Sequence, residues 1–236
     1  MTDFIQVRTL RWGRNAACVL RSLALLVLVA AASALDPPTV AGQEVDLDAL
    51  QDEAVDWLRG YLRVNTVNPP GNEIAGARYL AGILEAEGID HEIAESAPGR
   101  GNIWARLEGG EEPALLLLHH IDVVPADPRY WDADPFSAEV VDDVIYGRGT
   151  LDTKTLGILQ LAAFVALHRS GVELDRDVIW MATADEEAGG FFGAGWLVEE
   201  RPELFADVGF LLNEGGGGQM VDGNAAFGVE VTQKVP

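Results

Sequence analysis

The chain has 236 residues, and its 38 Asp and Glu side chains against 16 Lys and Arg give a formal net charge of −22. A chain this acidic is repelled by nucleic acids and by anionic membrane surfaces, so we expect neither as a partner. The single cysteine excludes an internal disulfide and a cysteine-rich zinc module. A hydrophobic content of 48% is that of a globular protein with a sizeable core. The acidic excess therefore forms either a solvated surface or a set of carboxylates that bind metal ions.

The first 34 residues have the pattern of an export signal. Arginines precede an apolar run over residues 23–32, and the small residues Ala32, Ser33 and Ala34 close it at the spacing of a signal peptidase site. The run is shorter than the ~20 apolar residues that span a membrane, so we predict cleavage and a secreted or periplasmic protein. An uncleaved N-terminal membrane anchor is the alternative. Apart from export, we expect no membrane association.

The remaining chain divides into a Pro-containing linker over residues 35–46 and one domain over residues 47–236. Helical spacing and short alternating or unbroken apolar runs identify the elements. In chain order we predict a helix at 47–64, a helix from the turn at 68–72 to Glu87, strands at 89–94, 102–107 and 114–118, a helix at 155–168, a strand at 178–182, a helix at 191–200 and a strand at 208–212. This order indicates an α/β fold with a largely parallel central sheet.

Polar side chains directly follow three of the predicted strands. They are His119, His120 and Asp122 after the first, Asp185, Glu186 and Glu187 after the second, and Asn213 and Glu214 after the third. Ligands in open α/β sheets bind outside the carboxyl ends of the strands, so we expect these groups to meet at one rim. Asp152, just ahead of the helix at 155–168, is a fourth contributor. One imidazole and several carboxylates suit one or two divalent ions and favour Zn²⁺, Co²⁺ or Mn²⁺.

Spacing limits the roles of these residues. Residues two apart in a strand face the same way, so His120 and Asp122 share a face and His119 points elsewhere. A histidine that binds metal usually gives its other N–H to a carboxylate, and Asp122 could accept it. Glu186 and Glu187 are adjacent, so they cannot both reach one metal from a regular strand end. One could be a ligand while the other is the general base on a water at the metal.

Each of these signals has a purely structural explanation when it is taken alone. An acidic triplet such as residues 185–187 is typical of the first turn of a helix, and Asp152 alone would be a helix N-cap. A dinucleotide fingerprint, a phosphate-binding P-loop and a Gly-x-Ser-x-Gly elbow are all missing from the sequence. A glycosidase with two acids from residues 185–187 would leave His120 and Asp152 without a role. The joint pattern therefore favours a metal site.

Four blocks in this order resemble the cocatalytic zinc metallopeptidases of peptidase family M20. They are residues 119–125, 146–154, 185–187 and 213–216, and the resemblance extends over residues 47–234. It implies a three-layer α/β catalytic domain. It also implies a metal-dependent hydrolase of amide bonds, of the carboxypeptidase or N-acyl-amino-acid deacylase (aminoacylase) type, acting on a peptide or an N-acyl amino acid.

The resemblance implies two divalent metal ions, with Zn²⁺ expected and Co²⁺ or Mn²⁺ as alternatives. In the family scheme His120 binds the first ion and Asp122 orients this histidine. Asp152 bridges both ions. Glu214 completes the first site and Glu187 binds the second ion.

The resemblance assigns Glu186 as the general base that takes a proton from the attacking water. The family pattern then continues with a lid and dimerisation domain and a later histidine for the second ion, whereas this chain ends at Pro236. We therefore expect an incomplete second site, exposed apolar surface, and a homodimer only through the lid domain. The alternative function is a truncated, catalytically weak or inactive metal-binding fragment of such an enzyme.

Overall fold

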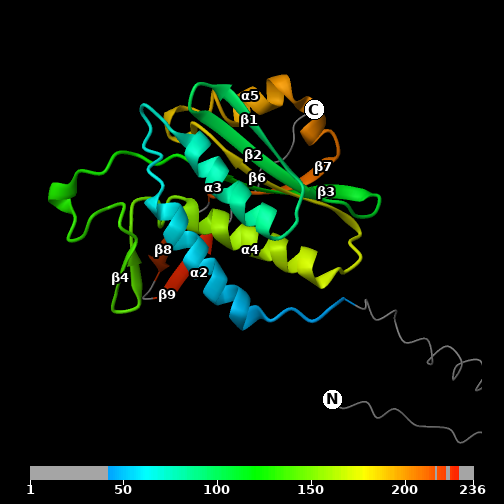
Figure 1. Cartoon of the computed structure of the whole chain (residues 1–236), viewed down its shortest axis with the longest axis horizontal. Helices are drawn as coiled ribbons and strands as arrows, with labels where there is room; N and C mark the ends of the chain where they lie inside the picture. Colours follow the sequence, from blue (N-terminus) through cyan, green and yellow to red (C-terminus); the bar gives the residue numbers. More distant parts are fainter. Residues whose placement is uncertain (1–41, 216, 222–223, 229–236) are drawn as a thin grey trace, which may run out of the picture. The chain divides into compact units, whose positions relative to one another are not determined.

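The computed structural model describes residues 42–215, 217–221 and 224–228 (Figure 1). The predicted export signal at 1–34, the linker up to residue 41 and the chain end at 229–236 lie outside the described residues. None of the described helices is long and apolar enough to span a bilayer. The fold described below is that of the predicted α/β domain.

The described helices agree closely with those predicted. They are α2 (Leu47–Arg63), α3 (Glu73–Ala86), α4 (Lys154–Ser170) and α5 (Ala194–Glu200). Helix α2 begins where the Asp46 carboxylate accepts a hydrogen bond from the Ala49 N–H at 3.0 Å. Helix α3 stops just before Gly88, which has a φ of +70°. Helix α5 begins later than predicted because residues 185–193 form a closed loop in which Gly189 and Gly190 have positive φ.

The described strands include two hairpins that the sequence did not predict. The strands are β1 (His91–Ala97), β2 (Arg100–Leu107), β3 (Glu112–His120), β4 (Glu139–Val141), β5 (Val144–Tyr146), β6 (Arg176–Thr183), β7 (Val208–Leu212), β8 (Gly217–Val221) and β9 (Asn224–Gly228). The missed hairpins are β4–β5 and β8–β9. The turn residues Asp142 and Asp143 of β4–β5 both have positive φ. Two-residue hairpin loops need this conformation, and the usual sequence signal for them is Asn-Gly or Asp-Gly. The pair Asp142-Asp143 lacks the glycine, so the sequence did not indicate a hairpin here.

The central sheet has the strand order β1-β2-β6-β3-β7. Strands β6, β3 and β7 are parallel, and β2 is antiparallel to both β1 and β6. Only β2 therefore runs against the other strands, which confirms the largely parallel sheet. Strand β3 continues two residues beyond the predicted apolar run because its ladder with β6 extends to the pair His120 and Thr183. Main-chain pairing does not require apolar side chains, so the two histidines belong to the strand.

Helices cover both faces of this sheet (Figure 1). Helices α2, α3 and α4 pack on one face, where Trp180 of β6 is fully buried. Ile179 and Met181 of the same strand point to the other face and pack with Leu197 of α5. This three-layer arrangement confirms the predicted fold class.

Strand β7 is the edge of the sheet next to β3 in the described part of the chain. Its three consecutive apolar residues Phe210, Leu211 and Leu212 are 53–57% exposed. Successive strand residues face opposite sides of a sheet, so both faces of β7 are apolar and open. The expected exposed apolar surface is therefore present.

Candidate metal centre

His120 stands at the carboxyl end of β3 and is 2% exposed. Its Nδ1 lies 2.9 Å from the main-chain oxygen of Asp122 and donates to it when protonated. Its Nε2 then faces three carboxylates, at 3.0 Å from Asp152 Oδ1, 3.4 Å from Glu214 Oε1 and 3.8 Å from Glu186 Oε2. The imidazole thus presents one nitrogen to a ring of acids that three separate segments provide.

The acids around His120 form two overlapping groups with the spacing of metal ligands. One group is His120, Glu186 and Glu214, and the other is His120, Asp152 and Glu187, with the ligand atoms of each within 4.8 Å of one another. All five residues are among those predicted from the sequence. The rim that was expected at the carboxyl ends of β3, β6 and β7 is therefore formed.

Asp122 is fully buried and holds the main chain that carries the two glutamates. Its Oδ1 accepts from the Glu186 N–H and its Oδ2 accepts from the Glu187 N–H, both at 3.1 Å. The predicted contact with His120 is present at 3.5 Å from Oδ1 to Nδ1, longer than the 2.9 Å to the Asp122 carbonyl. Asp122 therefore orients the histidine mainly through its carbonyl and the glutamates through its carboxylate.

Glu186 and Glu187 lie in a 3₁₀ turn (Glu186–Ala188) rather than on a regular strand end. Asp185 starts this turn with a φ of +68°. The turn directs the two glutamates into different ligand groups. The prediction that adjacent glutamates take separate positions agrees with this geometry, although the turn was not foreseen.

The chemistry of these residues fits a divalent cation. Burial alone would lower the pKa of His120, but the hydrogen bond and charge of Asp122, with the charges of Glu214 and Glu186, raise this pKa to about 9. Burial is the largest cause that raises the pKa of Glu187, and the charge of Asp152 adds to it. Bound protons thus neutralise part of the negative charge of the crowded carboxylates, and a metal ion that replaces these protons can neutralise the same charge. The Oε1 atom of Glu187 is buried with no hydrogen-bond partner among the described residues, as expected of a ligand atom.

His119 points away from this centre, as predicted. Its ring is fully buried beside Trp180 and Tyr61, and a Cβ on Gly157 would come within 2.3 Å of it. Burial, helped by the neighbouring charge of His120, lowers the pKa of His119 to about 3. His119 is therefore a neutral core residue and takes no part in the site.

Asp152 lies one residue before Thr153, the N-cap of α4. The structural explanation of an isolated Asp at this place, helix capping, therefore does not apply. Its side chain is 58% exposed and reaches His120 instead. A loop position ahead of the helix lets the carboxylate approach the imidazole from the side opposite to Asp122.

Lys154 fixes the start of α4, a role that the sequence did not suggest. It is fully buried, and its Nζ donates to the carbonyls of Tyr61 at 3.0 Å and Val64 at 2.8 Å. These carbonyls lie at the end of α2. Burial lowers the pKa of Lys154 to about 7, against the opposing charge of Asp122. The ties to α2 hold the loop that carries Asp152.

Asn68 and Arg100 are further residues of the site that the sequence did not single out. Asn68 is 2% exposed and donates to Asp122 Oδ2 at 2.8 Å, while the side chain of Arg100 reaches Asn68 and Asp185. An Asn beside prolines is an ordinary turn signal. An Arg at the start of a strand has no distinctive spacing, so only the folded structure shows their place.

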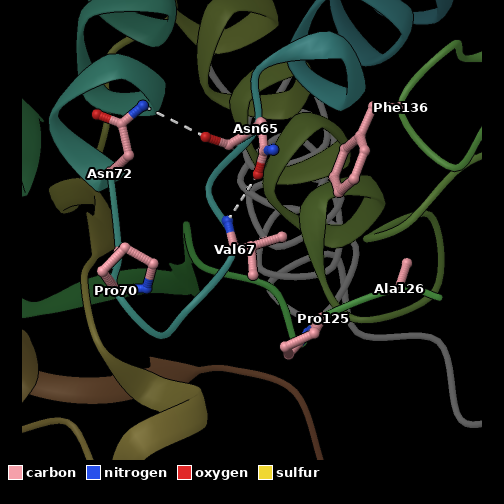
Figure 2. A pocket seen from close by; sticks show the side chains of 8 residues that line it. Asn65, Val67, Pro70, Asn72, Pro125, Ala126 and Phe136 are labelled. Carbon is pink, nitrogen blue, oxygen red and sulfur yellow. Dashed lines mark hydrogen bonds between the residues drawn. The ribbon is translucent and has the colours of Figure 1, made fainter.

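Figure 2 shows an apolar cavity, which has a volume of about 500 Å³. It is lined by Asn65, Val67, Pro70, Gly71, Asn72, Pro125, Ala126 and Phe136. Val67 pairs with Val123, the residue after Asp122, so the wall of the cavity continues directly from the site. The polar rim is engaged with its own main chain, since Asn65 Oδ1 accepts from the Val67 N–H at 3.1 Å and Asn72 Nδ2 donates to the Asn65 carbonyl at 3.3 Å.

Comparison with known proteins gives the family. The profile of peptidase family M20/M25/M40 matches residues 116–232. N-fatty-acyl-amino acid synthase/hydrolase PM20D1 of Xenopus tropicalis is 41% identical over 177 residues, which cover 69% of this chain and 33% of that protein. Human aminoacylase-1 is 34% identical over 167 residues, which cover 69% of this chain and 40% of that protein. The chain belongs to peptidase family M20/M25/M40.

Solved structures give the same fold. The M20 family metallo-carboxypeptidase Sso-CP2 from Sulfolobus solfataricus matches with a TM-score of 0.61 and 27% identity, over 70% of this chain and 38% of that one. The described domain thus has the α/β fold of M20 peptidases. The chain spans only 33–45% of the length of the curated relatives that it matches.

Proposed function

We propose that this chain is the metal-binding part of a hydrolase that cleaves amide bonds, either as a carboxypeptidase or as an N-acyl-amino-acid deacylase. The observation that carries the proposal is the approach of Asp152, Glu186 and Glu214 to within 3.8 Å of His120 Nε2 at the carboxyl end of a parallel strand. The names of the relatives, an aminoacylase, an N-fatty-acyl-amino acid synthase/hydrolase and a metallo-carboxypeptidase, support the same reaction.

Two divalent ions, with Zn²⁺ expected and Co²⁺ or Mn²⁺ as alternatives, are assigned to this centre. His120, Asp152 and Glu214 would hold the first, and Asp152 and Glu187 the second. When bound, the ions would supply positive charge at the scissile carbonyl and at the attacking water. The two candidate ligand groups share His120, so only one ion can have the imidazole. We therefore expect one tight site and one weak site per chain.

Glu186 is proposed as the general base. Its side chain is 51% exposed, so it can reach a water and a substrate, while the Asp122 carboxylate fixes its main chain. In this role its carboxylate takes a proton from the attacking water and returns it to the leaving amine. Glu187 is less exposed and has a buried oxygen with no hydrogen-bond partner in the described part of the chain, which suits a ligand better than a base.

The substrate is proposed to be a peptide or an N-acyl amino acid, acted on outside the cytoplasm after export by the signal at residues 1–34. The apolar cavity beside the centre has no charged lining residue, in contrast to the acidic chain as a whole. It suits an uncharged apolar group of the substrate, such as the acyl chain of an N-acyl amino acid.

Replacing Glu186 tests this function. Full-length wild type and Glu186→Gln would be compared for zinc content and for hydrolysis of N-acyl amino acids and dipeptides. We expect the variant to keep its metal and to lose activity by about 10²–10⁴-fold, the contribution of a general base. Glu199→Gln, on the exposed side of α5, is the matched control and should behave as wild type.

Undiminished turnover in Glu186→Gln would contradict the assigned mechanism. Zinc binding without any turnover in the wild type would favour the second function, a metal-binding chain that is catalytically weak or inactive. The shared His120 is the observation behind that second function, because it leaves one of the two ions with carboxylates alone.

A further inference from the structure

A buried polar cluster lies directly behind the candidate metal centre. Its members are Asn68, Arg100, Asp122 and Asp185, and we refer to these four residues as the clamp. Asn68, Asp122 and Asp185 are at most 2% exposed, and the side chain of Arg100 is 11% exposed. Four distant segments of the chain meet here, so the cluster exists only in the folded protein.

Asn68 joins the members of the clamp. Its Nδ2 donates to Asp122 Oδ2 at 2.8 Å and to Asp185 Oδ1 at 3.2 Å, and its Oδ1 accepts from Arg100 Nη2 at 3.0 Å. A side-chain amide has two N–H donors and one oxygen, and all of them are used. Two carboxylates on one side and a guanidinium on the other therefore require an amide at this position. A third carboxylate there would face two others.

The two aspartates hold the turn that carries Glu186 and Glu187 from both ends. Asp122 accepts the N–H groups of both glutamates. Asp185 Oδ2 accepts the Phe192 N–H at 3.1 Å, and the Asp185 carbonyl accepts the Gly190 N–H at 2.6 Å, which closes the loop. The main chain of the two glutamates is therefore fixed relative to β3.

Arg100 supplies the positive charge that lets these carboxylates be buried together. Its guanidinium contacts Asp185 Oδ1 at 3.1 Å and the fully buried Glu73, and stacks 5.3 Å from the ring centre of Phe192. A buried carboxylate without a partner costs free energy because water no longer solvates its charge. Arg100 is therefore needed to stabilise these carboxylates, whereas water would solvate the carboxylate partners of an exposed arginine. Phe192 is held twice, by its N–H on Asp185 and by its ring on Arg100.

Gly71 makes room for the guanidinium. It has a φ of +87°, and a Cβ at this position would lie 2.1 Å from Arg100 Nη1. The turn before α3 is thus shaped around the arginine. The space for Arg100 is set by the backbone and not by a movable side chain.

We propose that the clamp positions the metal centre, with Asn68 and Arg100 acting through Asp122 and Asp185 and touching neither metal nor substrate. The inference rests on the proposed function, since it concerns the same centre. The clamp fixes Glu186 and Glu187 relative to His120. Groups that hold metal ligands in place typically change metal affinity by 10–100-fold when they are replaced.

A matched pair of arginines on β2 tests the proposal. Arg100 and Arg106 each meet two carboxylates, but Arg106 pairs with Asp177 and Asp207, away from the centre. Cobalt titration of the full-length chain, followed by the visible absorption of Co²⁺, measures affinity and coordination geometry without any turnover. We expect Arg100→Gln to weaken cobalt binding by about 10–100-fold and to shift the cobalt spectrum. Arg106→Gln should leave both as in wild type.

Asn68→Asp is the second variant, for use if Arg100→Gln does not fold. It keeps the shape of the side chain, and we expect it to weaken cobalt binding by the same amount. Circular dichroism of the metal-free proteins reports folding in each case. Cobalt bound equally by wild type and by a folded Arg100→Gln or Asn68→Asp would overturn the clamp alone. A wild type that binds no cobalt would overturn the clamp together with the proposed function.

Discussion

Strand β2 carries the same charge pattern twice, at its two ends. Arg100 begins the strand among Glu73, Asn68 and Asp185, which are almost completely buried behind the metal centre. Arg106 lies six residues on, 30% exposed, with Asp177 and Asp207 at 20% and 50%. Exposed ion pairs contribute about 0–1 kcal/mol to stability, whereas an uncompensated buried charge costs several times more. The two ends of β2 therefore differ in burial and not in the number of ion pairs, and the buried end is the one that belongs to the clamp.

The largest expected effect comes from removing the two arginine charges. Arg100→Leu leaves Glu73 and Asp185 buried without compensation, so we expect the free energy of unfolding to fall by about 3–5 kcal/mol. Arg106→Leu should lower it by less than about 1 kcal/mol, because water can solvate Asp177 and Asp207. Urea unfolding of the metal-free proteins measures both. Equal losses would remove the distinction between the two ends of β2.

The pKa of the buried His120 makes the stability of the metal-free protein depend on pH. The folded pKa of His120 is about 9, above the ordinary value of 6.5. Its contribution to the stability of the metal-free protein is thus complete below about pH 6.5 and is lost as the pH rises through about 9. His120→Gln should flatten the pH dependence of stability in this window. Thermal unfolding between pH 6 and pH 10 measures the slope, and an unchanged slope in His120→Gln would contradict the assignment.

Two glycines give the smallest effects, and the effects should have opposite signs. Gly71→Ala forces a Cβ against Arg100 at a φ of +87°, so we expect a loss of about 1–3 kcal/mol. Gly82 lies inside α3 with nothing within 4 Å of an added Cβ, so Gly82→Ala should stabilise the protein by up to about 1 kcal/mol. The urea midpoints of the two variants measure both changes in stability. A stabilised Gly71→Ala would mean that Arg100 can move freely.

The metal rim could be predicted from the sequence because it follows from strand direction. His120, Asp185 and Glu214 come directly after apolar runs, and parallel strands bring their carboxyl ends to one edge. Asp152 could be added because it lies just ahead of a helix, but only the resemblance to the family gave it a role that bridges two ions. The structure confirms that these segments meet, whereas the role of each residue stays a prediction.

Asp122 and Asp185 could be placed at the rim from the sequence, but the contacts that join them to Asn68 and Arg100 in the clamp could not be predicted. Asn68 has the sequence context of a turn, and no spacing in the sequence links it to Asp122 or Asp185. Arg100 has no periodicity that separates it from Arg106. What distinguishes these residues is burial against partners 30 or more positions away in the sequence, and that information arises only when the layers pack.

The exposed apolar strand β7 has a consequence for how molecules of this protein meet in solution. Among the residues that the structure describes, no strand pairs with the outer edge of β7, and its apolar residues Phe210, Leu211 and Leu212 make this edge a template for edge-to-edge association. A net charge of −22 opposes such encounters, and the repulsion reaches only about 10 Å at 0.1 M salt and 30 Å at 0.01 M. Ionic strength therefore decides whether charge repulsion or association through the apolar edge of β7 dominates when two molecules meet.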